Sequence, residues 1–298
     1  MTKIAWVFPG QGSQFSGMGL DLIDHPIAQD RFTQAQEILG WSVPHLCQAA
    51  EEKLSNTLYT QPCLYVLSSI LAELLLQSRA EAAPALLAGH SLGEYVALNV
   101  AQVFNFEAGL RLVKRRAELM SQASEGTMVA LIGFNREQLT EIVHQTQNVV
   151  LANDNHEGQV VLSGTQEAID TVLAATKVKR KVPLSVSGAF HSPLMTAAAA
   201  EFKELLDSVA FQTAKIPVLS NVEPQPTCEA PLLKERLVRQ MTGPVRWREI
   251  GLEFNRRGIE QVIEVGPGKV LTGLIKRTCP GVALTNVSDL ESLQAIAP

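Results

Sequence analysis

Residues 85–98 read Ala-Leu-Leu-Ala-Gly-His-Ser-Leu-Gly-Glu-Tyr-Val-Ala-Leu, and this stretch decides the fold. The apolar run 85–88 predicts a buried strand and residues 94–98 predict a helix, with Gly89, Ser91 and Gly93 between them. Such a sharp turn needs the two glycines because a side chain there would clash with the neighbouring strand or helix. The turn places Ser91 at a helix N-terminus, where the dipole and free N–H groups favour a developing oxyanion. An ordinary serine cap of a helix has the same pattern, so other residues must decide whether Ser91 is a nucleophile.

Three further apolar runs have the length of short buried strands, at residues 4–8, 217–219 and 261–265. Helical patterns lie between the runs, for example over residues 107–120 and 197–208. Strands that alternate with helices favour a mainly parallel sheet that is covered on both faces. We therefore expect an α/β fold with a larger, α/β-hydrolase-like domain.

The middle of the chain has a different pattern, in the order β-α-β-β-α-β. The expected strands are 127–133, 149–153, 159–163 and 181–186, and the expected helices are 136–147 and 166–176. Asn135 and Thr165 are suited to cap the two helices, and the turn-forming residues 153–155 and Gly158 separate the middle strands. This order is the ferredoxin-like unit. We expect it as an inserted subdomain at 126–188, with residues 1–125 and 189–298 forming the larger domain.

Composition narrows the class of protein. The 298 residues carry a net charge of −5 and have a pI near 5.7, which argues against a nucleic-acid-binding surface. The apolar stretch 64–76 is interrupted by polar residues and falls short of the roughly 20 that a membrane span needs. The four cysteines show no metal-binding or Cys-x-x-Cys spacing, and the N-terminal apolar run is too short for a signal peptide. We expect a cytoplasmic protein with reduced cysteines and no metal.

A serine nucleophile needs a base, and His191 is the best candidate among the six histidines. His191 follows the last expected strand of the inserted unit, where the chain returns to the main sheet, and strand-end loops are where α/β sites form. His90 is adjacent to Ser91 and would point away from it. An α/β-hydrolase has its histidine late in the chain, and no histidine follows His191, which disfavours that class.

Two glycine-rich segments could suggest nucleotide binding, but neither completes its motif. After Gly10-Gln11-Gly12, the dinucleotide pattern needs a glycine where Phe15 stands. The segment 266–269 lacks the first glycine of a P-loop, which is Ile263 here. We expect Gly10-Gln11-Gly12 instead to bring a backbone N–H close to a substrate carbonyl.

Five segments in this order together resemble the malonyl-CoA:acyl carrier protein transacylases of bacterial-type fatty-acid synthesis. They are Phe-Pro-Gly-Gln-Gly-Ser-Gln at 8–14, Gly-His-Ser-Leu-Gly-Glu-Tyr at 89–95, Arg-Leu-Val-Lys-Arg-Arg at 111–116, Phe-His-Ser at 190–192 and Glu-Val-Gly-Pro-Gly at 264–268. The resemblance extends over essentially the whole chain.

The resemblance implies a role for each matching residue. Ser91 matches the nucleophile and His191 the base, while the backbone N–H groups of Gln11 and Leu92 match the oxyanion hole. Arg116 matches the arginine that binds the malonyl carboxylate, for which a guanidinium fork is well suited. The remaining two matches are Gln240, whose backbone carbonyl would orient the histidine, and Phe190, whose ring would exclude an α-methyl branch.

The implied reaction is a ping-pong transfer of the malonyl group from malonyl-CoA to the phosphopantetheine thiol of acyl carrier protein. The resemblance implies no cofactor, and we expect a monomer. Carrier proteins are acidic, and two basic clusters are candidates for docking: Lys177, Lys179, Arg180 and Lys181, or Arg246 and Arg248. Ordinary solvated charge explains each cluster equally well. Three alternatives stay open: an acyltransferase that supplies a polyketide synthase, a hydrolase that releases malonate, and a non-catalytic module that binds carrier protein.

Overall fold

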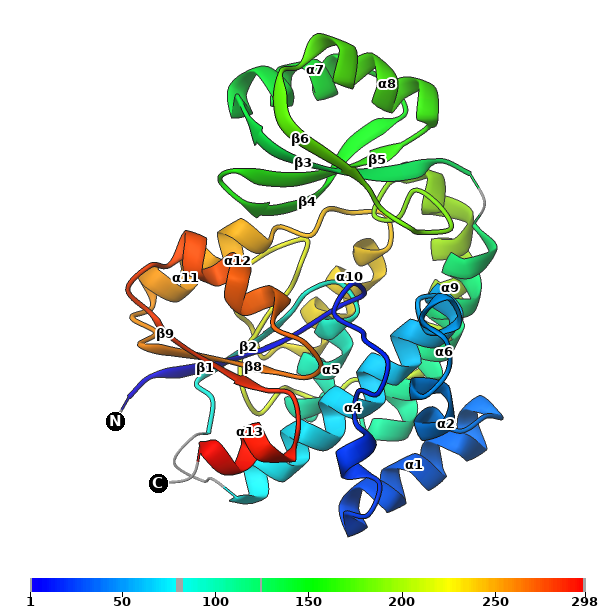
Figure 1. Ribbon diagram of the computed structural model, residues 1–298, viewed down its shortest axis with the longest axis vertical. Coiled ribbons are helices and arrows are strands. Elements are labelled where there is room, and N and C mark those ends of the chain that lie inside the picture. Colours follow the sequence, from blue (N-terminus) through cyan, green and yellow to red (C-terminus); the bar gives the residue numbers. More distant parts are fainter. Residues whose placement is uncertain (1, 79–82, 124, 297–298) are drawn as a thin grey trace.

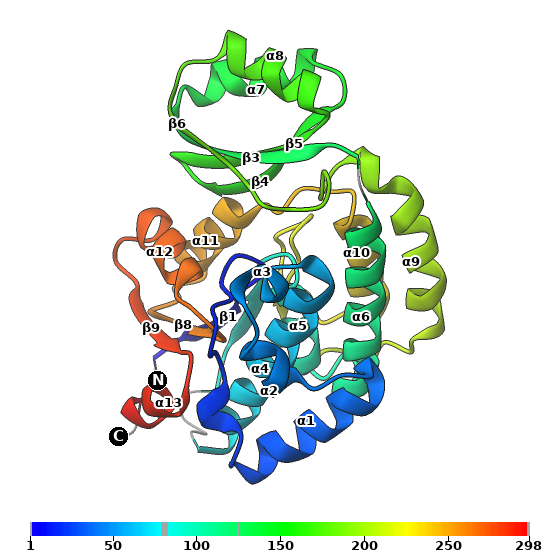
Figure 2. The same cartoon turned by 45° about the vertical axis from the view of Figure 1, so that its right-hand side comes forward.

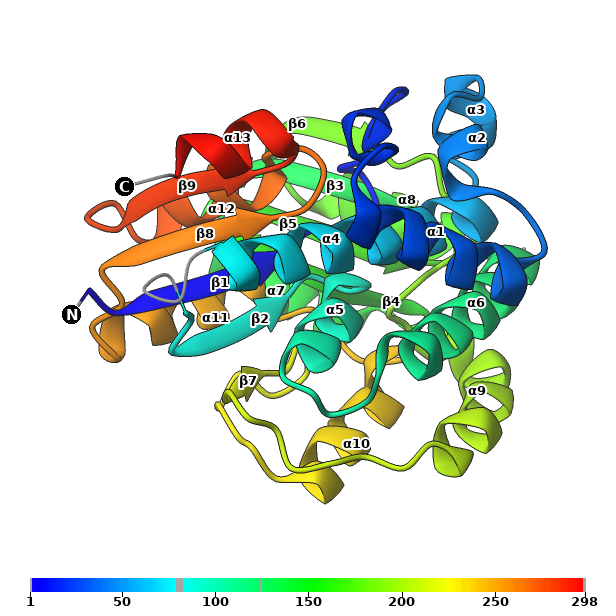
Figure 3. The same ribbon diagram turned by 90° about the horizontal axis from the view of Figure 1, so that it is seen from below.

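The computed structural model describes residues 2–78, 83–123 and 125–296, and it contains two separate sheets (Figure 1). The larger sheet has five strands in the order β7-β2-β1-β8-β9, and every neighbouring pair is parallel. Figure 3 shows these strands side by side. Their bounds are β1 (Ile4–Phe8), β2 (Leu86–Gly89), β7 (Val218–Leu219), β8 (Gln261–Val265) and β9 (Ala283–Val287). The expected parallel sheet is confirmed.

Both faces of this sheet are buried because successive side chains of a strand point to opposite faces. In β1, Trp6 and Phe8 lie in the main hydrophobic core, which also holds most of α4 (Thr57–Ser78) and α5 (Gly93–Val100). Ala5 and Val7 lie in a second core formed with α11 (Trp247–Arg256) and α12 (Val270–Thr278). The near-continuous apolar runs seen in the sequence follow from this two-sided burial.

The other helices cover the main core or join the strands. They are α1 (Pro26–Leu39), α2 (Val43–Cys47), α3 (Glu51–Leu54), α6 (Phe106–Gln122), α9 (Thr196–Ser208), α10 (Ala230–Gln240) and α13 (Leu290–Ala295), with short 3-10 helices at η1 (Leu20–Leu22) and η3 (Pro193–Met195). α4 is long and apolar enough to cross a membrane, but 83% of its most apolar window is buried inside the protein. It therefore packs as a core helix, against α5 and α6 among others.

The smaller sheet is antiparallel and lies at one end of the molecule (Figures 1 and 2). Its order is β4-β5-β3-β6, with bounds β3 (Thr127–Phe134), β4 (Val149–His156), β5 (Gln159–Gly164) and β6 (Val178–Pro183). α7 (Arg136–Gln145) and α8 (Gln166–Ala175) cover its outer face and share a separate hydrophobic core with it. Asn135 and Thr165 cap these helices, as the sequence predicts.

The predicted turn at residues 153–155 is wrong, because β4 runs through it to His156. Asn153 pairs with Val161 of β5, and the register shifts on both sides of it absorb the irregularity. The other edge of β4 is bound to the segment that precedes α11, where Asp154 N–H donates to the Val245 carbonyl (2.9 Å) and Val245 N–H to the Ala152 carbonyl (2.8 Å). This long-range pairing overrides the local turn preference. The last strand of the unit also begins and ends three residues earlier than expected, and β9 was not predicted.

Candidate functional site

The turn at Ser91 has the geometry that its sequence predicts. Ser91 has a φ of 51°, in the left-handed region, directly between β2 and α5. A Cβ on Gly89 would lie 1.9 Å from the backbone of Gly93, and a Cβ on Gly93 would lie 2.0 Å from the Phe8 carbonyl oxygen. Neither position can carry a side chain, so strand, turn and helix can pack this closely only with glycine.

His191 lies beside Ser91, although the two residues are far apart in the sequence. Its Nε2 is 2.8 Å from the Ser91 Oγ. Its Nδ1 is 2.9 Å from the carbonyl oxygen of Gln240 and 3.2 Å from that of Gly243. Carbonyl oxygens only accept hydrogen bonds, so Nδ1 carries the hydrogen and Nε2 presents its lone pair to the serine hydroxyl. This is the tautomer that a base acting on Ser91 requires.

The surroundings keep this imidazole neutral. Burial, together with the nearby Arg116 charge, lowers the pKa of His191 to about 3, against the opposing effect of the Gln240 and Gly243 carbonyls. His90 on the same turn is half-buried, and desolvation lowers its pKa to about 4. Its Nε2 lies 3.0 Å from the Asn155 Oδ1, so it contacts β4 and not the serine hydroxyl.

Arg116 extends from α6 to the serine and is only 1% exposed. Its Nη2 donates to the Ser91 Oγ (3.0 Å) and to the Gln240 Oε1 (3.2 Å), and its Nη1 donates to the Gln61 Oε1 (2.6 Å). Its Nε has no hydrogen-bond partner, and no carboxylate lies within ion-pair distance of it among the described residues. Burial lowers its pKa, but a guanidinium stays charged. The site therefore holds an unneutralised cation at the nucleophile.

Gln11 and Leu92 each present a backbone N–H that donates to no described residue. The Gln11 side chain is occupied, because its Nε2 donates to the Thr57 Oγ1 at 3.1 Å. The loop that carries Gln11 lies against the turn, where a Cβ on Gly10 would be 2.4 Å from the His90 carbonyl oxygen. Leu92 follows Ser91 directly and caps α5. Both N–H groups are thus free to bind an anion near Ser91.

The last two predicted site residues are buried. Phe190 packs in the main hydrophobic core immediately before His191. Gln240 ends α10 and is fully buried. Its carbonyl contacts His191 as predicted, but its side chain also contacts Ser91, Glu94 and Arg116.

Sequence reasoning missed Asn221, which lies just after β7 and holds the serine turn. Its Oδ1 accepts from the Ser91 N–H (2.7 Å) and its Nδ2 donates to the Gly89 carbonyl (2.6 Å). It also missed the Gln61 contact to Arg116 and the buried carboxylate of Glu94. One signal for Asn221 was available: it comes just after a predicted parallel strand, and the carboxyl ends of such strands meet at one edge of the sheet.

The two basic clusters differ in their partners. Arg246 is paired with Glu249 at 2.6 Å, and Arg248 is paired with Asp154 at 2.9 Å, so these charges are largely neutralised. Lys177, Lys179, Arg180 and Lys181 lie on or beside the edge strand β6, are exposed, and form no ion pair with another described residue. Of the two clusters, the one on β6 therefore has the unpaired positive charge that could attract an acidic protein.

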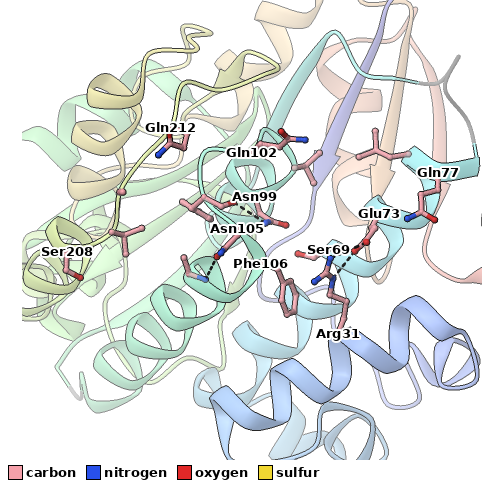
Figure 4. Close-up of a pocket in the computed structure, with 16 residues that line it drawn as sticks. Arg31, Ser69, Glu73, Gln77, Asn99, Gln102, Asn105, Phe106, Ser208 and Gln212 are labelled. Atoms are coloured by element: carbon pink, nitrogen blue, oxygen red, sulfur yellow. Dashed lines mark hydrogen bonds and ion pairs between the residues drawn. The ribbon is translucent and has the colours of Figure 1, made fainter.

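The structure also has a cavity of about 960 Å³ (Figure 4). An ion pair between Arg31 and Glu73 (2.8 Å) forms part of its lining, together with Asn99 and Gln212. None of the predicted site residues lines it, so it is separate from the serine site. Within residues 2–78, 83–123 and 125–296, no group of three or more His, Cys, Asp or Glu side chains is arranged to hold a metal ion.

Comparison with known proteins gives a consistent result. Residues 5–296 match the acyl transferase domain family. The chain is 51% identical over 294 residues to the malonyl CoA-acyl carrier protein transacylase of Synechocystis sp., covering 99% of this chain and all of the relative. The crystal structure of the Synechocystis malonyl-CoA:ACP transacylase superposes with a TM-score of 0.96, at 51% identity, over 99% of this chain and 100% of that one. A polyketide biosynthesis malonyl CoA-acyl carrier protein transacylase of Bacillus subtilis is 43% identical, over 92% of this chain and 96% of the relative.

Proposed function

The chain belongs to the acyl transferase family, and from this we propose that it transfers the malonyl group of malonyl-CoA to the phosphopantetheine thiol of an acyl carrier protein. The observation that carries the proposal is the buried, unneutralised guanidinium of Arg116, which lies 3.0 Å from the Ser91 Oγ beside a neutral histidine. A serine next to a base is suited to acyl transfer. A cation at the same oxygen favours an acyl group that ends in a carboxylate.

We also infer how the fold is divided. Residues 1–125 and 189–298 would form an α/β-hydrolase-like domain, and residues 126–188 an inserted ferredoxin-like subdomain. The strand order β4-β5-β3-β6 and the separate core under α7 and α8 support this division. Residues 1, 79–82, 124, 297 and 298 of these ranges lie outside the described residues.

In the first half-reaction, the Ser91 Oγ attacks the malonyl thioester carbonyl while its proton passes to the Nε2 of His191. The backbone N–H groups of Gln11 and Leu92 donate to the oxyanion that forms. The tetrahedral adduct collapses with cleavage of the carbon–sulfur bond, and the imidazolium proton goes to the departing sulfur of coenzyme A. A malonyl-serine ester remains.

In the second half-reaction, the carrier-protein thiol gives its proton to the same Nε2 and its sulfur attacks the ester. The carbon–oxygen bond to Ser91 breaks and the proton returns to the Oγ. His191 is cationic only between these transfers, and the Gln240 and Gly243 carbonyls stabilise it in that form because its Nδ1–H donates to them.

Arg116 is placed to select the acyl group. In a malonyl ester the free carboxylate is two bonds from the carbonyl carbon that Ser91 attacks, so a guanidinium already in contact with the Oγ is close enough to bind it. The partnerless Nε provides a further donor for a bidentate contact. Phe190 would disfavour an α-methyl branch, a discrimination worth about 1–3 kcal/mol.

The proposed steps use only a hydroxyl, an imidazole, a thioester and a thiol, so we propose that the reaction needs no metal or redox cofactor. We propose a monomer that acts in the cytoplasm, free of nucleic acid and membrane. The net charge of −5 argues against nucleic-acid binding, and the burial of α4 inside the protein argues against its use as a membrane span.

Intact-protein mass spectrometry after mixing with malonyl-CoA tests the nucleophile. The wild-type protein should gain one malonyl group and lose it when carrier protein is added, and Ser91→Ala should gain none. A Ser91→Ala protein that is still labelled stoichiometrically would refute the assignment.

A polyketide synthase carrier is the second candidate for the acceptor, and the 43% identical relative from polyketide biosynthesis favours keeping it. The chemistry at Ser91 would be the same. Competition between a fatty-acid and a polyketide carrier protein for the malonyl-serine ester would decide, because the physiological carrier should have the higher kcat/KM.

A further inference from the structure

The side chain of Gln240 hydrogen-bonds both buried charged residues of the site, Arg116 and Glu94. Its Nε2 donates to the Ser91 carbonyl and to the Glu94 Oε2, both at 2.8 Å, and its Oε1 accepts from the Arg116 Nη2 at 3.2 Å. The amide therefore lies between a buried guanidinium and a buried carboxylate. The predicted role of this residue used only its backbone carbonyl.

The surroundings determine the direction of the amide. Turning it by 180° would place its oxygen against the Glu94 carboxylate and its NH2 group against the Arg116 guanidinium, where like partners face each other. In the observed direction both amide hydrogens have acceptors and the oxygen has a cationic donor. Gln240 thus separates the two charges and holds both of them.

All three hydrogen-bond acceptors of Arg116 are neutral groups. Its partners are the amide oxygens of Gln61 and Gln240 and the hydroxyl of Ser91. Such groups position a guanidinium and leave its charge uncompensated. The acidic residue that acts electrostatically on Arg116 is Glu94, which is 1% exposed and hydrogen-bonds the opposite end of the Gln240 amide.

We propose that the Gln240 side chain is a specificity-determining residue: it holds Arg116 with a neutral oxygen and keeps the Glu94 carboxylate away from it, so that the acyl group supplies the carboxylate that pairs with Arg116. The inference rests on the proposed function. A carboxylate in place of the amide oxygen would occupy Arg116 itself and compete with malonyl, but not with an acyl group that has no charge. The Gln240 side chain acts through Arg116, which makes it a positioning residue.

A charge exchange tests this inference with little change in shape. The double variant Glu94→Gln/Gln240→Glu keeps one carboxylate and one amide and moves the negative charge next to Arg116. It also removes the Gln240 donor to the Ser91 carbonyl, a loss that both acyl groups share. The single variant Glu94→Gln is the matched control, because it shares the change at position 94 and retains the neutral Gln240. Acyl-enzyme formation is measured for both, and for wild type, with malonyl-CoA and acetyl-CoA.

We expect the double variant to lower kcat/KM for malonyl-CoA at least about 30-fold more than for acetyl-CoA, the size expected when a close buried charge pair is blocked. The Glu94→Gln control should keep the wild-type ratio of the two substrates within about threefold. If the double variant and the control have the same ratio, the inference is wrong.

Two further outcomes separate the possible failures. Wild-type protein that transfers no malonyl group would reject the proposed function, whatever the variants do. If the double variant does not fold, Gln240→Glu alone is used, with Gln240→Met as its uncharged control. A malonyl-selective loss in Gln240→Glu that Gln240→Met lacks supports the inference, and equal losses overturn it.

Discussion

Replacing Arg116 with alanine should slow malonyl transfer much more than acetyl transfer. The guanidinium is 1% exposed and 3.0 Å from the nucleophile, so its removal would leave a bound malonyl carboxylate buried without a partner. Removing one member of such a buried pair costs about 2–5 kcal/mol, or roughly 30- to 4000-fold in kcat/KM. We therefore expect a loss of about 100-fold or more for malonyl-CoA.

The acetyl group has no carboxylate, so its loss should be much smaller. Arg116→Ala also removes the donor to Ser91, Gln61 and Gln240, which loosens the site for either acyl group. A hydrogen bond from a charged group contributes at least about 1.5 kcal/mol, which corresponds to a loss of roughly tenfold or more that acetyl-CoA and malonyl-CoA share. The ratio of the two losses, more than either loss alone, measures the contribution of the charge.

Quenched-flow labelling with radioactive malonyl-CoA and acetyl-CoA measures this ratio in the first half-reaction. Arg115→Ala is the matched control, because Arg115 is the preceding residue of α6 but points to the surface, where it pairs with Glu201 at 2.8 Å and Glu118 at 3.4 Å. Surface ion pairs contribute little, so both rates should stay within about twofold of wild type. If Arg116→Ala slows both acyl groups by the same factor, the reasoning about its charge is refuted.

Two further predictions concern His191 and Asn221. Burial lowers the pKa of His191 from 6.5 to about 3, so the unfolded chain binds a proton at this residue below about pH 6.5 that the folded protein does not bind until about pH 3. Stability should therefore fall as pH decreases through this window. Between pH 7 and pH 4.5, His191 should lower the free energy of unfolding by an amount on the order of 2–3 kcal/mol. Urea unfolding of His191→Gln should therefore depend less steeply on pH than that of wild type. Parallel curves for the two proteins would contradict the argument. Asn221→Ala removes the acceptor of the Ser91 N–H and the donor to the Gly89 carbonyl. In steady-state kinetics, kcat should fall about 10- to 100-fold, with less effect on KM. An unchanged kcat would show that the turn holds Ser91 without Asn221.

Much of the fold could be predicted from the sequence, because both faces of the parallel sheet are buried and its strands are therefore apolar throughout. The strands that became β1, β2, β7 and β8 are short apolar runs next to glycine or proline, and all four lie in the predicted sheet. β9 was harder to find because it is an edge strand whose residues alternate less clearly and are only partly buried. The predicted turn at 153–155 was wrong because its backbone pairs with Val245, a residue that is remote in the sequence.

The serine site, like the fold, could be predicted only in part from the sequence. The spacing of Gly89, Ser91 and Gly93 already requires a sharp turn, since the steric conflict at each glycine is local to the turn and its neighbouring strand. Ser91, His191 and Arg116 were identified from their sequence contexts and from a family resemblance, and the structure brings His191 and Arg116 each within hydrogen-bond distance of the Ser91 Oγ. Their distances, the histidine tautomer and the lowered pKa could come only from the folded chain, because burial and carbonyl contacts produce them.

The sequence by itself determined which residue types are available for acyl transfer: a serine in a glycine-flanked turn, a histidine after a strand and an arginine on a helix. Only the tertiary structure decided that Arg116 is held by neutral groups and that the Gln240 amide stands between it and Glu94. These residues come from α6, α10 and α5, and no periodicity relates them. Their charges act through distance and burial, which exist only after α5, α6 and α10 have packed together around Ser91.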